Sequence, residues 1–203
     1  MIIMNSTRNY QKHVSKNPLQ KFLIENFYTT LLESLQGIKL KSILDAGCGE
    51  GFTLAKLQQN KIAQHLEGID ISRDAIRLGK SMYPSISFKL GSIYKLPYKD
   101  NSFDLVLCCE VLEHLEDPHK ALQELIRVSK KYCLLTVPNE PLFMISNFLR
   151  GKNWSRWGND IEHINHWSKN GFEKLVRKKQ LKLLVTKTPF PWTLVLGQKI
   201  RGK

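Results

Sequence analysis

The sequence predicts an α/β protein built on a mostly parallel sheet, and three observations indicate this class. Short apolar segments of strand length alternate with segments of helical periodicity over about residues 41–140, as is typical of right-handed βαβ units. A glycine-rich segment follows the first expected strand. Near the C-terminus, two strand-like segments are joined through Pro189-Phe190-Pro191, which favours an antiparallel pair at a sheet edge. The length of 203 residues fits one domain with a buried core.

The first expected element is a helix after Asn17. Asn17 can cap this helix, Pro18 suits its first position, and Gly37 follows its end. Apolar side chains recur at four-residue spacing and are expected to form one apolar face: Leu19, Leu23, Phe27, Leu31 and Leu35.

The remaining elements follow from apolar run length and periodicity. Strands are expected over residues 42–47, 66–71, 86–90, 103–109 and 132–137. Helices are expected between them over residues 52–60, 73–82 and 118–130, with Ser72 as a cap for the second. A helix over 169–180 and strands over 181–188 and 193–200 are expected to follow.

Positive charge is concentrated in the C-terminal third. The chain has 31 Lys+Arg and 18 Asp+Glu, a net charge of +13. Residues 41–140 hold 13 basic and 13 acidic side chains, whereas residues 141–203 hold 13 basic and 3 acidic ones. This excess favours an anionic partner, such as nucleic acid, a membrane surface or a phosphorylated substrate. A Lys-rich solvated surface explains the same count equally well.

Other features of the sequence favour a cytoplasmic protein. No apolar run approaches the ~20 residues that span a bilayer, and Met1-Ile2-Ile3-Met4-Asn5-Ser6 lacks the apolar stretch of a secretory signal. The four Cys residues form no Cys-x-x-Cys pair, which argues against a structural zinc site. Together these features predict a reduced, cytoplasmic compartment.

The most informative segment is Asp45-Ala46-Gly47-Cys48-Gly49-Glu50-Gly51, between the first core strand and the next helix. Its glycines let the backbone turn tightly and let a ligand approach the main chain. Asp70 ends the second strand, where an acid can accept hydrogen bonds from two ribose hydroxyls. Phe52 stands where a dinucleotide-binding fingerprint has its third Gly, and the segment lacks the Lys-Ser/Thr ending of a P-loop. The segment therefore matches neither of these nucleotide-binding motifs.

The pattern Asp-x-Gly-x-Gly-x-Gly closely resembles motif I of the class I S-adenosylmethionine (SAM) methyltransferases. Other motifs of that class follow in order within residues 41–140: Asp70, Gly91-Ser92-Ile93, Ser102-Phe103-Asp104-Leu105-Val106, Glu110-Val111-Leu112-Glu113-His114-Leu115 and Val137-Pro138-Asn139. The chain looks like the type 11 methyltransferase-domain family, with motifs similar to those of ubiquinone-pathway O-methyltransferases.

This resemblance implies a Rossmann-like, seven-stranded, mostly parallel sheet with helices on both faces and an antiparallel last strand. It also implies that residues 1–203 form a single SAM-dependent methyltransferase domain. The expected parts are an N-terminal helical cap (1–40), a SAM-binding core (41–140), a lid and substrate segment (141–170), and a C-terminal helix with edge strands (171–203).

The resemblance implies S-adenosyl-L-methionine as the cofactor. Asp45 would stand near its ammonium group, and Asp70 would bind its ribose. Ile71 would pack on the adenine. The full set of residues implied around the cofactor is Asp45, Gly47, Cys48, Gly49, Asp70, Ile71, Ser92, Ile93 and Glu110.

Two of these implied contacts differ in kind from the others. Ser92 would meet the adenine edge together with Ile93, in place of the Asp that many family members carry, and its hydroxyl accepts more weakly than a carboxylate. Glu110 would line the cleft where methyl donor and acceptor meet.

The residues from Glu110 to His114 could form a metal site or supply a general base. Glu110, Glu113 and His114 have i, i+3, i+4 spacing, so on a helix they would share one face and could hold a divalent cation. His163 or His166 could add an imidazole. The Glu-x-x-Glu-His arrangement looks like that of metal-assisted small-RNA 2′-O-methyltransferases, yet the superfamily also has it without metal. His114 is therefore predicted as the catalytic residue and no metal is assigned.

The expected acceptor is a small or lipid-like molecule, bound beside residues 142–167. Basic side chains there are interleaved with aromatic ones: Phe143, Phe148, Arg150, Lys152, Trp154, Arg156, Trp157 and Trp167. This long connection suits stacking on a ring or a base beside a phosphate, or an amphipathic helical cover whose aromatic side chains pack onto the sheet. RNA methylation, a non-catalytic SAM-binding role and peripheral membrane contact stay open as alternatives.

Overall fold

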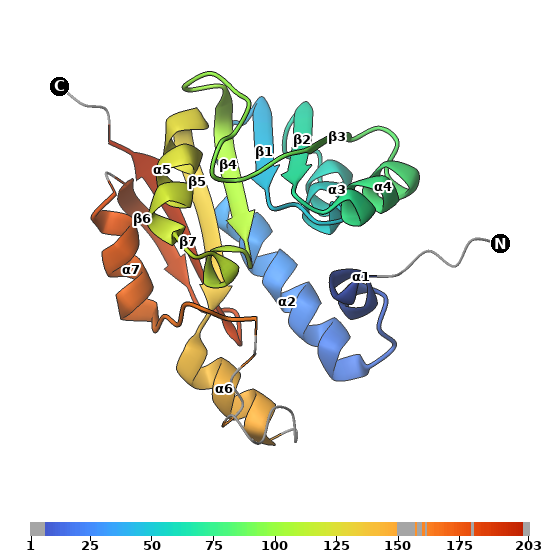
Figure 1. Ribbon diagram of the computed structural model, residues 1–203, viewed down its shortest axis with the longest axis vertical. Helices are drawn as coiled ribbons and strands as arrows, with labels where there is room; N and C mark the ends of the chain where they lie inside the picture. Colours follow the sequence, from blue (N-terminus) through green and yellow to red (C-terminus); the bar gives the residue numbers. More distant parts are fainter. Residues whose placement is uncertain (1–6, 150–156, 158–159, 161, 180, 201–203) are drawn as a thin grey trace.

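The computed structural model describes residues 7–149, 157, 160, 162–179 and 181–200. Seven strands form one sheet in the order β3-β2-β1-β4-β5-β7-β6 (Figure 1). The strands are β1 (Ser42–Ala46), β2 (His65–Asp70), β3 (Ser87–Leu90), β4 (Phe103–Cys109), β5 (Ser129–Pro138), β6 (Leu181–Lys187) and β7 (Trp192–Lys199). β1 to β5 pair in parallel, and β7 lies antiparallel between β5 and β6. The predicted fold class, including the antiparallel pair at the edge, is confirmed.

The helices within the described residues cover the sheet and its carboxyl end. They are α1 (Arg8–His13), α2 (Pro18–Ser34), α3 (Phe52–Gln59), α4 (Arg73–Met82), α5 (Pro118–Val128), α6 (Glu140–Leu149) and α7 (Lys169–Arg177), with the 3-10 helix η1 (Leu112–His114). α1 and α6 lie where the parallel strands end (Figure 1). No helix in this described part of the chain is long and apolar enough to span a bilayer.

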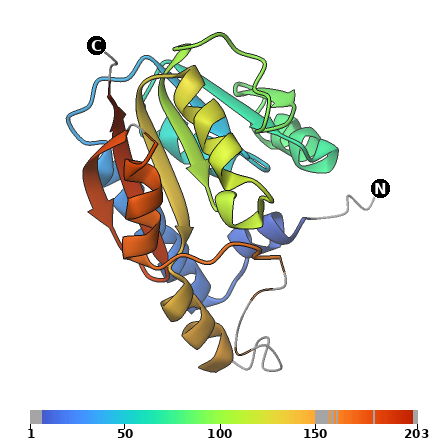
Figure 2. The same cartoon turned by 60° about the vertical axis from the view of Figure 1, so that its left-hand side comes forward.

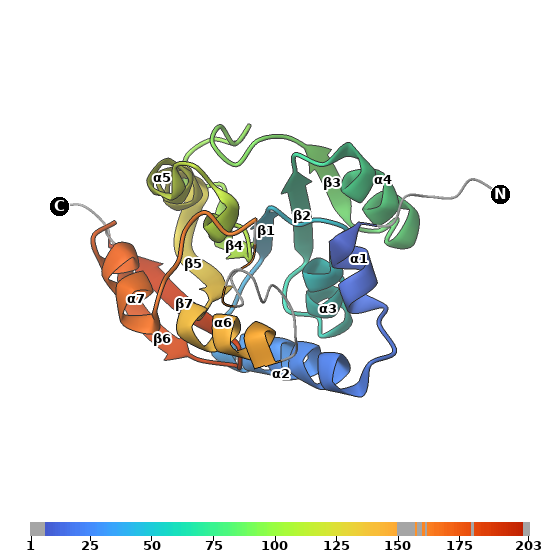
Figure 3. The same ribbon diagram turned by 60° about the horizontal axis from the view of Figure 1, so that its bottom comes forward.

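Both faces of the sheet are buried by helices. α5 and α7 cover one face, whereas α2 and α3 lie on the other (Figures 2 and 3). β4 shows why the strands are continuously apolar: Val106 and Cys108 pack toward α5, and Leu105 and Leu107 pack toward the opposite helices. Successive side chains of a strand point to opposite faces, so a strand covered on both sides needs apolar residues at every position.

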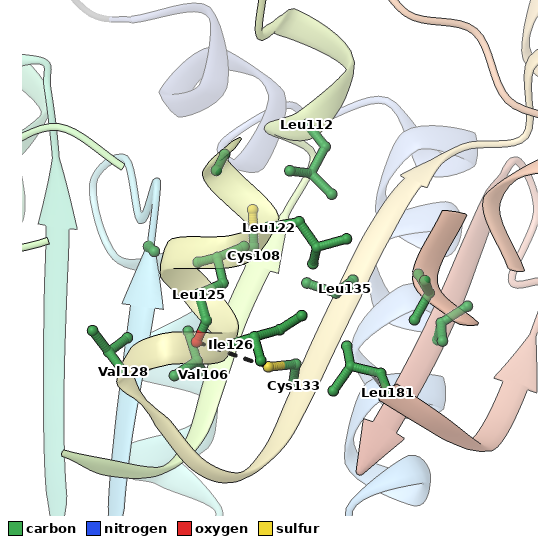
Figure 4. Packing of buried hydrophobic residues seen from close by; sticks show 14 of the residues in the cluster. Val106, Cys108, Leu112, Leu122, Leu125, Ile126, Val128, Cys133, Leu135 and Leu181 are labelled. Atoms are coloured by element: carbon green, nitrogen blue, oxygen red, sulfur yellow. Dashed lines mark hydrogen bonds between the residues drawn. The ribbon is translucent and has the colours of Figure 1, made fainter. Parts of the chain in front are cut away.

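The cluster under α5 shows how tightly this layer packs. Leu122 and Leu125 of α5 are fully buried against Val106 and Leu135 of the central strands (Figure 4). Fully burying a Leu side chain is worth roughly 1.5–3 kcal/mol, so this face holds α5, and with it the segment between β4 and α5, in place.

The expected first helix is α2, and its apolar face is buried over only part of its length. The Asn17 side chain accepts a hydrogen bond from the Gln20 N–H at 3.2 Å, which confirms the cap. Leu31 and Leu35 are buried, but Leu19 is 53% exposed. The first turns of α2 extend past the carboxyl end of the sheet (Figure 1), so Leu19 has no strand to pack on.

One helix was not predicted, and another agrees with one of two alternatives. The helix that was not predicted is α1, a short helix capped by Thr7, whose hydroxyl accepts from the Tyr10 N–H at 3.0 Å. α6 starts directly after β5, in the segment for which a helical cover was one of the two alternatives. Of the residues expected in that segment, Arg150, Lys152, Trp154 and Arg156 lie outside the described part of the chain.

Candidate active site

A cavity of about 970 Å³ opens at the carboxyl ends of β1, β2 and β4. Residues of α1, α2 and α6 form its walls. All of the residues that the sequence analysis predicted for the site line this cavity: Asp45, Gly47, Cys48, Gly49, Asp70, Ile71, Ser92, Ile93, Glu110 and His114. The structure therefore brings the whole predicted set together, although their individual roles stay predictions.

The loop after β1 needs glycine at two positions. Gly47 has φ of 84°, and a Cβ there would lie 2.4 Å from Cγ2 of Val111. Gly51 has φ of 85°, and a Cβ there would lie 2.5 Å from the ring of Phe88. A left-handed backbone is costly for other residues, and a Cβ at these distances would displace its neighbour. The glycines are thus explained by backbone conformation and close packing around the loop.

Asp70 ties the ends of β1 and β2 to each other. Its Oδ2 accepts a hydrogen bond from the Gly49 N–H at 2.8 Å, and its Oδ1 accepts one from the Ser72 N–H at 2.8 Å. The Gly47 N–H donates to the Ile69 carbonyl at 2.8 Å. Because each carboxylate oxygen can accept more than one hydrogen bond, Asp70 keeps acceptor capacity toward the cavity.

Asp45 is a buried acid with an unsatisfied oxygen. Its side chain is 2% exposed, and its Oδ1 has no hydrogen-bond partner among the described residues. Burial raises the pKa of Asp45 to about 7, and the nearby charge of Asp70 adds to this rise. A buried acceptor without a donor is unfavourable, so this wall of the cavity suits a positively charged or donating group of a ligand.

The residues expected at the adenine form an apolar edge of the cavity. Ile71 is 76% exposed although it is a large aliphatic residue. Ser92 accepts a hydrogen bond from the Tyr94 N–H at 3.3 Å, and Ile93 is half-buried beside it. An exposed aliphatic side chain on a cavity rim offers contact area for a flat ring.

Glu110 departs from the expected helix. It follows β4 with φ of 58°, and its Oε1 accepts a hydrogen bond from the Thr136 hydroxyl at 3.1 Å. Burial raises the pKa of Glu110 above its ordinary value. η1 begins only at Leu112. The expectation that Glu110, Glu113 and His114 share a helix face is therefore wrong, because the left-handed turn separates Glu110 from the others.

His114 and Glu113 lie on η1 at the cavity wall. His114 Nδ1 is 2.8 Å from the Glu162 carbonyl oxygen, and its Nε2 is 3.9 Å from Glu113 Oε1. Glu113 is 1% exposed, and neither carboxylate oxygen has a hydrogen-bond partner among the described residues. Burial and the neighbouring charge of Glu110 raise the pKa of Glu113 well above its ordinary value.

A second imidazole comes from His163, which the sequence analysis offered as one of two candidates. His163 Nδ1 is 2.8 Å from Glu140 Oε1, and its ring centroid is 5.1 Å from that of His114. Burial alone would lower the pKa of His163, but the adjacent Glu140 raises it above the ordinary value. His166 also lies near this acid, with its Nδ1 3.4 Å from Glu140 Oε1.

α1 lies within the N-terminal helical cap expected from the sequence, but its contacts with the glycine loop were not predicted. Asn9, Lys12 and His13 line the cavity, and the His13 ring stacks on Phe52 at 4.1 Å between centroids. Thr7 and Asn9 donate hydrogen bonds to the buried Glu50 of the glycine loop. The Thr7 cap is the local signal that could have predicted this helix, while its contact with Glu50 spans more than forty residues.

The sheet order, the antiparallel β7, the glycine loop after β1 and the acid ending β2 are similar to those of class I SAM-dependent methyltransferases. The family model described as a methyltransferase domain matches residues 44–136. These findings support a class I SAM-dependent methyltransferase, with SAM as its cofactor.

Two curated relatives support this assignment. An uncharacterized methyltransferase of Schizosaccharomyces pombe is 41% identical over 103 residues, which are 45% of this chain and 37% of that protein. The norajmaline N-methyltransferase of Rauvolfia serpentina is 33% identical over 114 residues, which are 53% of this chain and 36% of that enzyme. The match thus spans little more than a third of either relative.

Solved structures show the same fold at low identity. A protein of Pyrococcus horikoshii superposes with a TM-score of 0.72 at 19% identity, covering 95% of this chain and 99% of that one. The chain bound to the Trm112 methyltransferase activator in a Haloferax volcanii complex superposes with a TM-score of 0.71 at 18% identity, covering 90% and 93%. These likenesses establish the architecture.

Proposed function

We propose that this chain transfers a methyl group from SAM to a small-molecule or lipid-like acceptor. The observation that carries the proposal is the single cavity that joins the glycine loop to the Glu110 and His114 side. Its volume of about 970 Å³ lies at the upper end of the about 300–1,000 Å³ typical of ligand pockets. That leaves room for a cofactor and an acceptor side by side.

The residues of the cavity fit three parts of SAM: its methionine moiety, its ribose and its adenine. The unpartnered Oδ1 of Asp45 suits the ammonium group, and Gly47 leaves open the backbone surface under the methionine moiety. Asp70 would accept from the ribose hydroxyls, with its carboxylate held by Gly49 and Ser72. The exposed Ile71 would be covered by the adenine ring.

SAM supplies a methyl group that is already activated by its sulfonium centre, so the protein contributes mainly position and alignment. The acceptor would enter on the Glu110 side. There, Glu110 is fixed by Thr136, and His114 is fixed by the Glu162 carbonyl. This carbonyl accepts the Nδ1 proton, so the Nε2 lone pair of His114 is left to contact the acceptor.

Isothermal titration calorimetry with SAM tests the proposal. We expect one site per chain and a comparable affinity for the demethylated product. Gly47→Ala is expected to abolish binding, whereas Gly37→Ala, a glycine with φ of 78° and open space around it, should bind as the native chain does. No heat at millimolar SAM would overturn the proposal. Acceptor classes are then compared by SAM turnover, and RNA affinity that is absent at low salt would remove nucleic acid.

A further inference from the structure

Three side chains that could hold a metal converge on the acceptor side of the cavity. Glu113, His114 and His163 each offer one ligand atom, and these atoms lie within 4.8 Å of one another. All three residues line the cavity. Glu113 and His114 come from η1, and His163 comes from the segment before α7, about fifty residues further along the chain. The tertiary fold therefore assembles this cluster.

The two imidazoles are oriented by acceptors on their outer side. Glu140 Oε1 lies 2.8 Å from His163 Nδ1, and the Glu162 carbonyl oxygen lies 2.8 Å from His114 Nδ1. A carbonyl or a carboxylate accepts a proton from a ring nitrogen, so Nδ1 carries the hydrogen in both rings. Each Nε2 then has its lone pair available. Outer partners of this kind usually orient histidines that bind metals.

Glu113 supplies the observation that points to a cation. It is 1% exposed, and both of its oxygens lack a hydrogen-bond partner among the described residues. The nearest basic nitrogen, His114 Nε2, stays 3.9 Å away. A buried carboxylate without donors is costly, and a bound cation would compensate both oxygens.

We propose that Glu113, His114 and His163 bind a divalent transition-metal cation at the acceptor side of the cavity. Two imidazoles and one carboxylate favour ions such as Zn²⁺, Mn²⁺ or Fe²⁺ over Ca²⁺, which takes oxygen ligands. Glu110 is not a ligand, because its turn directs it to Thr136 instead. Three protein ligands leave coordination positions open to a further molecule.

The effect of a bound cation on methyl transfer rests on the proposed function, whereas binding of the cation itself does not. A hydroxyl oxygen of the acceptor would occupy an open position, and the cation would lower the pKa of that hydroxyl, so that its proton is lost to water. The oxygen would then form the bond to the methyl carbon as the bond from that carbon to the sulfur of SAM breaks, leaving the demethylated product. Water thus replaces His114 as the proton acceptor, because the Nε2 of His114 is a metal ligand. Acceptors with a hydroxyl or a neighbouring pair of oxygens would be preferred.

Cobalt titration of the full chain tests the site. After dialysis against a chelator, the native chain is titrated with Co²⁺ and followed by visible absorption and by calorimetry. We expect one Co²⁺ per chain, with absorption typical of mixed nitrogen and oxygen ligands. Glu113→Gln and His163→Asn are expected to weaken binding at least tenfold. Glu140→Gln should weaken it about 10–100-fold through the orientation of His163.

His119→Asn is the matched control, because His119 is exposed on α5 and does not line the cavity. It should bind Co²⁺ as the native chain does. Thermal unfolding of each variant verifies that it is folded. If His163→Asn does not fold, Co²⁺ binding by Glu140→Gln tests the role of His163 instead. No Co²⁺ uptake at millimolar concentration, or equal uptake by Glu113→Gln, would overturn the proposal. SAM calorimetry on the same samples tests the proposed function separately.

Discussion

The carboxylate of Asp70 accepts a hydrogen bond from the backbone N–H of Gly49 at 2.8 Å, so the end of β2 holds the glycine loop that follows β1. The other oxygen of Asp70 accepts from the Ser72 N–H at the start of α4. One side chain thereby fixes the relative positions of two backbone segments that line the cavity.

Asp70→Asn should weaken SAM binding and lower stability together. An amide side chain can accept with its oxygen, but its nitrogen cannot accept from the second N–H. Either Gly49 or Ser72 then loses its partner, at about 1–3 kcal/mol for a buried donor. We expect a fall of that size in the free energy of unfolding, measured with urea, and a roughly tenfold weaker SAM affinity by calorimetry.

Asp74→Asn is the control for this change. Asp74 pairs with Arg77 on the exposed surface of α4 at 2.9 Å, and such surface pairs contribute about 0–1 kcal/mol. Both measurements should stay near their native values. An Asp70→Asn variant that binds SAM as tightly as Asp74→Asn would contradict the role assigned to this carboxylate.

Gly47→Ala should disrupt the loop through two separate effects. The left-handed φ of 84° costs an alanine about 1–2 kcal/mol. Its Cβ would also lie 2.4 Å from Val111 Cγ2, which forces the start of η1 to move. We expect a stability loss of at least about 2 kcal/mol, measured by chemical unfolding.

Gly37→Ala separates the two effects, because Gly37 has φ of 78° but no atom within 4 Å of its added Cβ. Only the backbone cost should remain there. Gly47→Ala,Val111→Ala should recover part of the loss, since it removes the colliding methyl groups. Equal losses for Gly47→Ala and Gly37→Ala would show that packing against Val111 is unimportant.

The sheet and the glycine loop that lines the cavity could be predicted from the sequence because both depend on local signals. Continuous apolar runs mark strands that are buried on both faces, and the glycines of the loop report its backbone conformation directly. The apolar face of α2 is exposed at Leu19, and the apolar spacing could not show this, because it does not tell where the sheet under a helix ends. The convergence of His163 on Glu113 and His114 depends on tertiary contacts from Glu140 and Glu162, which no spacing in the chain encodes.

Asp45→Asn should affect the free protein and its complex with SAM in opposite directions. At pH 8 the free chain keeps an ionised Asp45 buried with an unpartnered oxygen, and a neutral amide removes that charge. We expect a higher melting temperature for the variant at pH 8. Only below the ordinary pKa of 3.8 is Asp45 protonated in both the folded and the unfolded chain, so the difference should shrink as pH falls and nearly vanish there. SAM affinity at pH 8 should fall at least tenfold, because the ammonium group loses its charged partner.

SAM affinity should rise with pH between about pH 5 and 7, because the ammonium group of SAM is expected to favour the ionised form of Asp45. Burial, with a contribution from Asp70, raises the pKa of Asp45 to about 7 in the free chain. The neighbouring Cys48, Cys109 and Tyr28 stay neutral in this range, since burial raises their pKa values above the ordinary ones. Binding below pH 7 should therefore release a proton from Asp45.

The stability of the free chain should change in the opposite sense. The folded pKa of Asp45 is about 7 and its ordinary value is 3.8, so the native state binds more protons than the unfolded state between these values. The contribution of Asp45 to the free energy of unfolding is thus present at low pH and is lost as pH rises toward 7. Calorimetry at pH 6 in two buffers of different ionisation enthalpy measures proton release, for which we expect close to one proton in the native chain and none in Asp45→Asn. Equal proton release by the two chains would assign the titration to another group.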